Sequence, residues 1–342
     1  MRKITTVLLI LLPLLATGVG AGLVAETWRK AGPGYEWEFP RDRHLHPDYK
    51  TEWWYITGHL WPQGDPDAEP FGYQLTFFRS GLSQGDSLTS ESAWEPVDLI
   101  MGHAAVSDPS QNRHVFSEVL WRTTPFLGGF GAPGDTTLAW CRAPAGTDAR
   151  WELSFRDGAY RLEVRDDSRD LRYELLCRPS REPLFHGEGG FSPKSSSGQA
   201  GSLYFSRTRM VTSGTMYRSG EPVQVRGESW LDREIFTSTL TGNQKGWDWT
   251  ALRLADGRDL MLYQLRDGQG ETDFALGTLR DSEGNTSPMP GNIWSLEPLE
   301  FWTSPLTGSR YPVAWKLTLA GEEPWRMEAV FPEQENVSTR TG

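Results

Sequence analysis

Hydrophobic and polar residues alternate with a period of two along much of the chain. In residues 150–156, apolar side chains occupy every second position, and the same alternation resumes after Asp157-Gly158. An Asp-Gly pair between two alternating runs is a strong hairpin signal, because both residues tolerate the positive φ of a tight turn. The pattern therefore predicts antiparallel strands that are buried on one face.

Comparable runs recur along the chain, and no persuasive amphipathic helix interrupts them. This predicts an all-β fold of antiparallel barrels or sandwiches, in which closure protects strand edges. The remaining predicted strands cover residues 52–61, 71–79, 99–106, 114–122, 202–210, 223–230, 249–255, 258–266, 273–279, 313–319 and 326–331.

A breaker-rich segment divides the predicted strands into two groups. In residues 187–202, 11 of 16 positions are Gly, Ser or Pro, which indicates a linker or a long functional loop. We therefore expect two β domains, residues 26–186 and 203–342. A short echo supports related units: an aromatic pair precedes Tyr-Gln-Leu in each half, at residues 73–75 and 263–265.

The first 25 residues resemble a Sec signal peptide. Arg2 and Lys3 precede an uncharged, mostly apolar stretch that ends in small residues. Cleavage would leave no membrane span, whereas an uncleaved segment would act as an anchor. Either case predicts a periplasmic or secreted, extracytoplasmic protein. In an oxidising compartment Cys141 and Cys177 either form a disulfide or remain two separate buried thiols.

Composition and missing motifs exclude several function classes. The 34 Lys+Arg against 45 Asp+Glu give a net charge of −11, which disfavours a nucleic-acid partner. The chain lacks a Gly-x-Ser-x-Gly elbow, a phosphate loop, a dinucleotide fingerprint and a His-Glu-x-x-His motif. We therefore expect no cofactor. His44, His46 and Asp48 would share one strand face, but no further ligand is evident, so we predict no metal.

Several carboxylates lie among aromatic residues, where burial raises a pKa and creates a proton donor. Glu52 directly precedes Trp53-Trp54 and is either such a proton donor or the partner of Lys50 in an ion pair. His103 is either a core residue or a pocket acid or base. A second run of acids alternates around Trp230 and comprises Glu228, Asp232 and Glu234. These acids are either partly buried proton donors or a solvent-exposed acidic edge.

Five motifs together resemble the AttH-like, carotenoid-hydratase (CrtC-type) family. They occur in the family's order and cover most of residues 35–332. They are residues 46–55 (HPDYKTEWWY), 102–108 (GHAAVSD), 194–195 with 204–209 (KS, YFSRTR), 227–234 (GESWLDRE) and 246–249 (GWDW). The resemblance implies two tandem lipocalin-like β domains with a cavity for an apolar ligand. It also implies a departure, since hydratase members tend to have His and Trp where this chain has Arg233 and Ile235.

The resemblance and the residues together suggest two functions. The first is binding of an apolar unsaturated lipid, terpenoid or polyketide, with cofactor-free hydratase or isomerase activity. The second is non-catalytic binding as a component associated with an export transporter. Members of the family are often labelled secreted hydrolases. The candidate catalytic residues are Glu52, His103, Glu228, Asp232 and Glu234. The candidate ligand-binding residues are Trp54, Gln74, Lys194, Tyr204, Arg209, Trp247, Trp249 and Tyr263.

Overall fold

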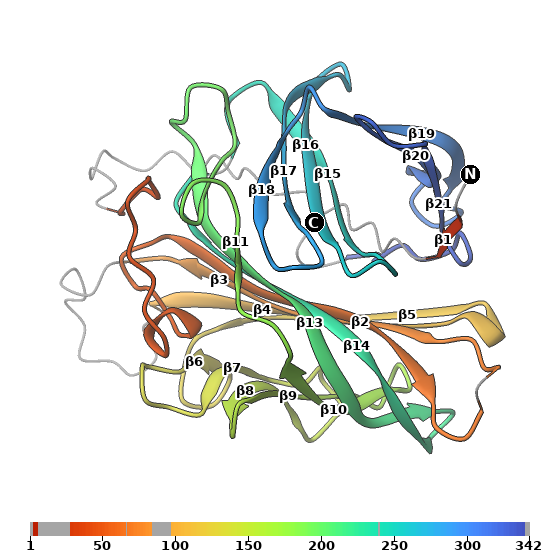
Figure 1. The fold of residues 1–342 in the computed structure, drawn as a ribbon. Helices are drawn as coiled ribbons and strands as arrows, with labels where there is room; N and C mark the ends of the chain where they lie inside the picture. The colour runs from red at the N-terminus through yellow and green to blue at the C-terminus, as the bar shows by residue number, and fades with distance from the viewer. Residues whose placement is uncertain (1–2, 6–27, 66, 84–96, 239, 339–342) are drawn as a thin grey trace.

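The strands of the described residues form three sheets (Figure 1). The computed structural model describes residues 3–5, 28–65, 67–83, 97–238 and 240–338. Two short 3-10 helices, η1 (Arg41–Arg43) and η3 (Pro109–Gln111), are the helical elements of this part. The all-β prediction is therefore confirmed.

The largest sheet curls into a nearly closed barrel. Two short strands, β11 (Leu184–Phe185) and β12 (Phe191–Pro193), also pair with β13. In spatial order the other members are β5 (Arg113–Arg122), β4 (Asp98–Asp108), β3 (Phe71–Gly81), β2 (Thr51–Pro62), β14 (Glu221–Phe236), β13 (Gly201–Arg218), β10 (Leu171–Pro179), β9 (Ala159–Asp166), β8 (Arg150–Arg156), β7 (Thr137–Arg142) and β6 (Gly128–Phe130).

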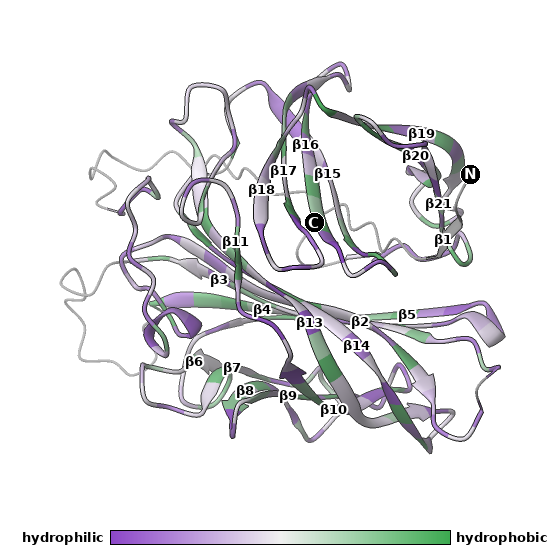
Figure 2. Cartoon of the chain, viewed as in Figure 1, coloured by the Kyte–Doolittle hydropathy of each residue, from purple (hydrophilic) through white to green (hydrophobic). Residues whose placement is uncertain are grey.

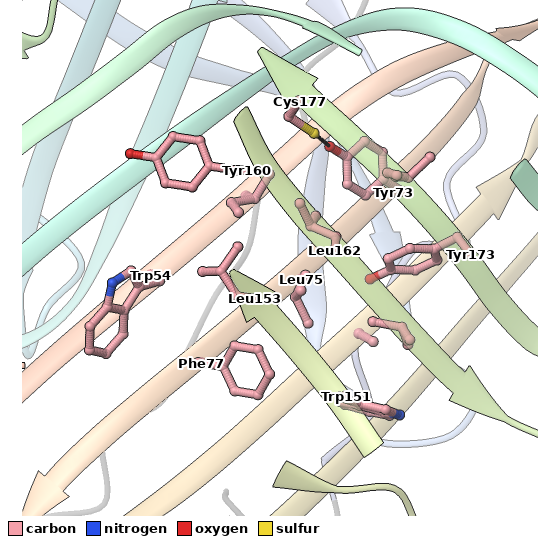
Figure 3. Close-up of a cluster of buried hydrophobic side chains, with 14 of the residues drawn as sticks. Trp54, Tyr73, Leu75, Phe77, Trp151, Leu153, Tyr160, Leu162, Tyr173 and Cys177 are labelled. Carbon is pink, nitrogen blue, oxygen red and sulfur yellow. Dashed lines mark hydrogen bonds between the residues drawn. The ribbon is translucent and has the colours of Figure 1, made fainter. Parts of the chain in front are cut away.

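One apolar core fills the barrel. Trp54, Leu75 and Phe77 from β2 and β3 face Trp151 and Leu162 from β8 and β9 (Figure 3). The predicted alternation accounts for this core, since every second residue of each strand points inward. Hydrophobic and hydrophilic residues are accordingly interleaved along the strands (Figure 2).

Two smaller sheets complete the molecule and lie above the barrel in Figure 1. A second apolar core, which includes Leu262, Trp294 and Trp315, joins them. The first of these sheets has the order β15 (Gln244–Arg253), β16 (Asp259–Asp267), β17 (Thr272–Arg280), β18 (Thr286–Pro290); the second has β1 (Lys3–Thr5), β21 (Trp325–Glu328), β20 (Arg310–Leu319), β19 (Trp294–Thr303).

The predicted Asp-Gly hairpin is present. Asp157 (φ 54°) and Gly158 (φ 74°) connect β8 to β9, and both have the positive φ that the tight turn requires. The register pairs Phe155 with Tyr160 and Leu153 with Leu162. The turn thereby places the apolar residues of both strands on the core face.

Sheet membership does not change at residues 187–202. β13 and β14 follow this segment, yet they pair with β10 and β2 in the barrel sheet. The segment itself contributes β12 to that sheet. It is a loop that folds back onto β13, and the smaller sheets begin only at Gln244. In the sequence echo, β2 and β3 are neighbours, as are β15 and β16.

The two cysteines are separate thiols. Cys141 on β7 and Cys177 on β10 are both free and fully buried. Cys177 lies with its sulfur 3.5 Å from the hydroxyl of Tyr73 (Figure 3). Of the two alternatives for this pair, the structure therefore has the buried thiols and not the disulfide.

The predicted signal peptide falls mainly outside the described residues. Only Lys3–Thr5 of this segment is described, and its backbone pairs in parallel with β21. If residues 1–25 are removed, this sheet retains β19, β20 and β21. Among the described residues, no helix has the length and apolar character needed to cross a bilayer.

Close backbone approach explains Gly227 on β14. A Cβ atom there would lie 1.9 Å from the carbonyl oxygen of His59 on the neighbouring β2. We expect Gly227→Ala to lower the free energy of unfolding by about 1–3 kcal/mol, because neighbouring backbone must shift. Gly242→Ala, where a Cβ meets nothing within 4 Å, is the control and should change it by less than about 0.5 kcal/mol. Equal urea-unfolding midpoints for both variants would contradict this explanation.

Candidate functional site

A cavity of about 100 Å³ lies between the outer face of the barrel sheet and the β15–β16 pair. Four barrel strands supply one wall, and the other wall comes from β15, β16 and two loops. Its lining is mainly aromatic and contains two carboxylates and one ammonium group. The lining residues are Trp53, Tyr55, Thr76, Phe78, Lys194, Tyr204, Asp232, Glu234, Leu240, Trp247, Trp249, Tyr263 and Leu265.

Asp232 on β14 is the acid at the centre of the hydrogen bonding around this cavity. Its Oδ1 accepts hydrogen bonds from Tyr204 Oη at 2.8 Å, Trp230 Nε1 at 2.9 Å and Ser206 Oγ. Its Oδ2 is buried and has no hydrogen-bond partner among the described residues. Burial raises the pKa of Asp232 to about 7, although the three donors act in the opposite direction. The carboxyl group is therefore partly protonated near neutral pH.

Glu234, two residues further along β14, is paired instead. Its Oε1 lies 2.9 Å from Nζ of Lys194, and Ser202 donates a hydrogen bond to the same oxygen. Nζ of Lys194 also lies 4.0 Å from the centroid of the Tyr263 ring. Burial opposes the charged ammonium, but Glu234 and Tyr263 outweigh it and raise the pKa of Lys194. Glu234 and Lys194 therefore place two opposite charges, with no net charge between them, at one end of the cavity.

Aromatic rings surround the acid. Nε1 of Trp249 donates to Oη of Tyr204 at 3.1 Å, and Tyr204 in turn donates to Asp232. The ring of Tyr55 meets Trp249 edge to face, with centroids 5.7 Å apart. Such rings fix the orientation of the acid and present π faces that attract a positive charge.

The structure brings together seven of the predicted site residues, all in the lining of this cavity. They are Asp232 and Glu234 of the catalytic set and Lys194, Tyr204, Trp247, Trp249 and Tyr263 of the binding set. The sequence reasoning missed Trp53, Tyr55, Thr76, Phe78, Leu240 and Leu265. The alternation on β2 places Trp53 and Tyr55 on the opposite face from Glu52 and Trp54. This alternation could have identified Trp53 and Tyr55 among the six missed residues.

Glu52 and Trp54 lie on the opposite face of β2 from the cavity. Glu52 is fully buried and bonds to Arg233 and to Nη1 of Arg79, at 3.2 Å from the latter. Burial alone would raise its pKa, but Arg233, His46 and Arg79 bring the pKa of Glu52 to about 2. A permanently ionised group outside the cavity is no proton donor. The expected ion pair forms, with arginines rather than with Lys50 as the partners described.

Arg233 also faces away from the cavity. Its guanidinium carbon lies 3.8 Å from the centroid of the Trp54 ring. Ile235 points to the same side and packs with Tyr49 and Leu203. The departure from the His and Trp of hydratase members therefore changes the buried ionic cluster around Glu52, which includes Arg79, Arg233 and His46. It does not change the lining of the cavity.

His46 lies between two carboxylates of this cluster, Asp42 (Nε2–Oδ1 2.9 Å) and Glu52 (Nδ1–Oε2 3.1 Å). Burial disfavours the charged ring, but the two carboxylates outweigh it and raise the pKa of His46. A raised folded pKa means that protonated His46 stabilises the fold fully below its unfolded pKa of about 6.5. This stabilisation is lost as pH rises through the higher folded pKa.

The expected result is a stability difference between wild type and His46→Gln that is largest near about pH 6 and shrinks as the pH rises through the higher folded pKa of His46. Urea unfolding at each pH measures it, and the difference removes contributions that both proteins share. A difference that grows with rising pH would contradict the assigned protonation.

Four other predicted residues lie outside the lining of the cavity. His103 sits between the rings of Phe78 and Phe116, and burial lowers its pKa to about 4. Gln74 bonds to Thr76 and Asn336. Glu228 is half exposed and lies 3.8 Å from Arg253, and Arg209 is bonded to Asp259 at 2.8 Å.

The His44, His46 and Asp48 pattern does not converge on a metal position. Both ring nitrogens of His44 contact backbone carbonyls, of Pro40 and Asp135. His46 is held by Asp42 and Glu52 as described. In the described ranges, no group of three or more His, Cys, Asp or Glu side chains is arranged to hold a metal ion.

The fold and the site define an all-β protein in which a nearly closed barrel carries an aromatic cavity against its outer face. The chain belongs to the AttH-like family, whose model matches residues 30–341. The crystal structure of an AttH protein from Nitrosomonas europaea is similar, with a TM-score of 0.74, 32% identity and 88% of each chain covered.

Kievitone hydratase from Nectria haematococca has the same fold at lower identity. Its TM-score is 0.63 at 14% identity, and the match covers 92% of this chain and 87% of that one. No curated protein matches the chain significantly. The family resemblance drawn from the five motifs is thereby confirmed.

Proposed function

We propose that the protein binds an apolar, unsaturated small molecule in the cavity between the sheets and protonates it from Asp232. It would then act as a cofactor-free hydratase or isomerase. The observation that carries this proposal is a buried acid with a pKa of about 7 in a cavity lined by Trp and Tyr side chains. A general acid works best when its pKa lies near the working pH.

The proposed chemistry is balanced without a cofactor. The O–H bond of protonated Asp232 breaks as a new C–H bond forms at one alkene carbon, which leaves a carbocation at the other carbon. In a hydratase, water adds to this cation and returns one proton to the Asp232 carboxylate. In an isomerase, the cation instead loses a neighbouring C–H proton to that carboxylate. Both routes restore the starting enzyme.

The aromatic lining supports the cationic intermediate. A desolvated cation over an aromatic face gains about 0.5–2 kcal/mol per ring. Trp53, Trp247 and Trp249 provide indole rings in the lining, and indole is the most effective aromatic group for this purpose. The ammonium of Lys194 is already paired with Glu234, so the cavity end that holds them has little net charge. These features favour an apolar ligand over an anionic one.

The comparisons with known structures are compatible with the proposed hydratase reaction. The structural neighbour from Nectria haematococca is named a hydratase, and this chain shares its fold. The aromatic lining suits apolar molecules with an isolated double bond. Prenylated phenols and isoprenoid alkenes combine these two features and serve as probes of this class.

The test is incubation of the protein with a panel of prenylated phenols and acyclic isoprenoid alkenes in D₂O, followed by mass spectrometry. A hydratase yields a product that has gained one D₂O, with one deuterium bound to carbon. An isomerase yields an isomer with one deuterium on carbon. Saturable binding without any incorporated deuterium would overturn the catalytic proposal and favour a non-catalytic binding role, such as service to an export transporter.

We also propose that the protein works outside the cytoplasm, on the basis of the signal-like residues 1–25. N-terminal sequencing of the protein expressed with its own leader in a bacterial host tests this. A mature chain that begins near Glu26 in the periplasmic or secreted fraction supports it. An intact Met1 in the cytoplasmic fraction contradicts it.

A further inference from the structure

His186 is a buried histidine that lies behind the cavity wall. It directly follows β11, and its backbone N–H donates to the carbonyl of Tyr204 at 3.0 Å. Its ring is fully buried and lies 4.1 Å, centroid to centroid, from the ring of Tyr204. Arg280 anchors the preceding turn through the carbonyls of Glu182 (3.0 Å) and Pro183 (2.7 Å). The imidazole is therefore held firmly next to the residues that bind Asp232.

A chain of hydrogen bonds connects this ring to the acid. Nε2 of His186 lies 2.7 Å from Oγ of Ser206, and Ser206 Oγ donates to Oδ1 of Asp232. A serine hydroxyl has one hydrogen, and here it is used toward Asp232. The contact with His186 is then a hydrogen bond from Nε2–H to Ser206, which requires the Nε2–H tautomer.

The other ring nitrogen agrees with this assignment. Nδ1 of His186 is buried and has no hydrogen-bond partner in the described part of the chain. A proton on Nδ1 would be a buried donor without an acceptor, which is costly. Burial, together with the positive charges of Lys194 and Arg280, lowers the pKa of His186 well below its ordinary value, so the ring is neutral.

We propose that His186 is a positioning residue for proton transfer: as a neutral Nε2–H imidazole it orients the Ser206 hydroxyl toward Oδ1 of Asp232 and thereby keeps the transferable proton on Oδ2. Three donors occupy Oδ1, whereas Oδ2 has no partner among the described residues. The assignment of a transferable proton rests on the proposed function, but the hydrogen-bond chain exists without a ligand.

Removal of the imidazole donor has a defined electrostatic effect. Without His186, the Ser206 hydroxyl is less polarised and less firmly oriented, so the ionised form of Asp232 loses stabilisation and its pKa rises. Four other groups that face Asp232 remain in place: Tyr204 from β13, Tyr55 from β2, Glu234 from β14 and Lys194 from the loop after β12. A shift in the pKa of Asp232 on removal of the imidazole donor therefore reports on the hydrogen bonds from His186 through Ser206 to Asp232.

The test uses the full chain with ¹⁵N-labelled histidine and ¹³C-labelled aspartate carboxyl groups. NMR should show the Nε2–H tautomer of His186 at neutral pH. In His186→Phe the acid dissociation constant of Asp232 should fall about 3- to 10-fold, and His186→Gln, whose amide can donate to Ser206, should restore part of it. An Nδ1–H tautomer, or an unchanged Asp232 titration in folded His186→Phe, would overturn the proposal.

A second pair of variants keeps the test decisive if His186→Phe does not fold. Ser206→Ala removes the hydroxyl that links His186 to Asp232 and leaves the His186 ring in place. His186→Gln should then have no further effect on the Asp232 titration in the Ser206→Ala background, and a full additive effect there would overturn the proposal. These measurements need no turnover, so a failure of the proposed activity is seen separately, as absent deuterium incorporation by the wild type.

Discussion

Asp232→Asn is expected to lose about 10²- to 10⁴-fold in turnover, the usual contribution of a general acid. The amide has nearly the same volume as the carboxyl group, and its oxygen can still accept from Tyr204, Ser206 and Trp230. It has no acidic proton to transfer to an alkene. Deuterium incorporation in D₂O, measured at saturating substrate, compares the variant with the wild type.

Glu228→Gln is the matched control for this loss. Glu228 lies on the same strand, but its side chain is 45% exposed and lies outside the lining of the cavity. We expect the control to retain full turnover. Wild-type turnover in a folded Asp232→Asn would remove Asp232 from the mechanism, and a comparable loss in Glu228→Gln would show that the effect is not specific to the cavity.

Arg233→Ala is expected to lower the free energy of unfolding by about 3–5 kcal/mol, as when one partner of a buried ion pair is removed. The substitution leaves the fully buried carboxylate of Glu52 with less compensating charge, and it removes the guanidinium from the face of Trp54. Urea unfolding followed by tryptophan fluorescence measures the change.

The double variant Glu52→Gln/Arg233→Met separates the ion pair from simple loss of packing. Because both charges are removed together, its cost should be well below the sum of the two single variants. Additive costs, or a loss below about 1 kcal/mol in Arg233→Ala, would contradict the role of this pair. Glu52→Gln alone should lose stability, because Glu52 belongs to the buried ion pair and is not the proton donor that the sequence suggested.

The local pattern of the chain was enough to predict most of the strands and their two faces, although β18 and β19 were not among them. It could not tell which face of β2 points toward the cavity. That depends on the pairing of Thr51–Pro62 with β14, more than 150 residues away in sequence, and on β15 and β16, which cover one face. Glu52 and Trp53 are neighbours in sequence, yet one belongs to a buried ionic cluster and the other to the cavity.

Long-range contacts also decide the site residues. Asp232 and Glu234 were predictable from a run of acids around Trp230, and Lys194 from the family motif in a Gly-rich loop. His186 had no such signal, since its link to Asp232 passes through Ser206 and two strand pairings. Conversely, Arg233 and Ile235 replace the His and Trp of hydratase members, but the side chains of both face away from the cavity.

The central claim is that Asp232 is a buried acid that is protonated near neutral pH, and a ¹³C NMR titration of its carboxyl carbon tests this most directly. Asp232→Asn identifies the resonance. The structure predicts a midpoint near pH 7, because burial raises the pKa of this carboxyl group. A midpoint near the ordinary value of about 4 would contradict the account, because the group would then be ionised and unable to donate a proton.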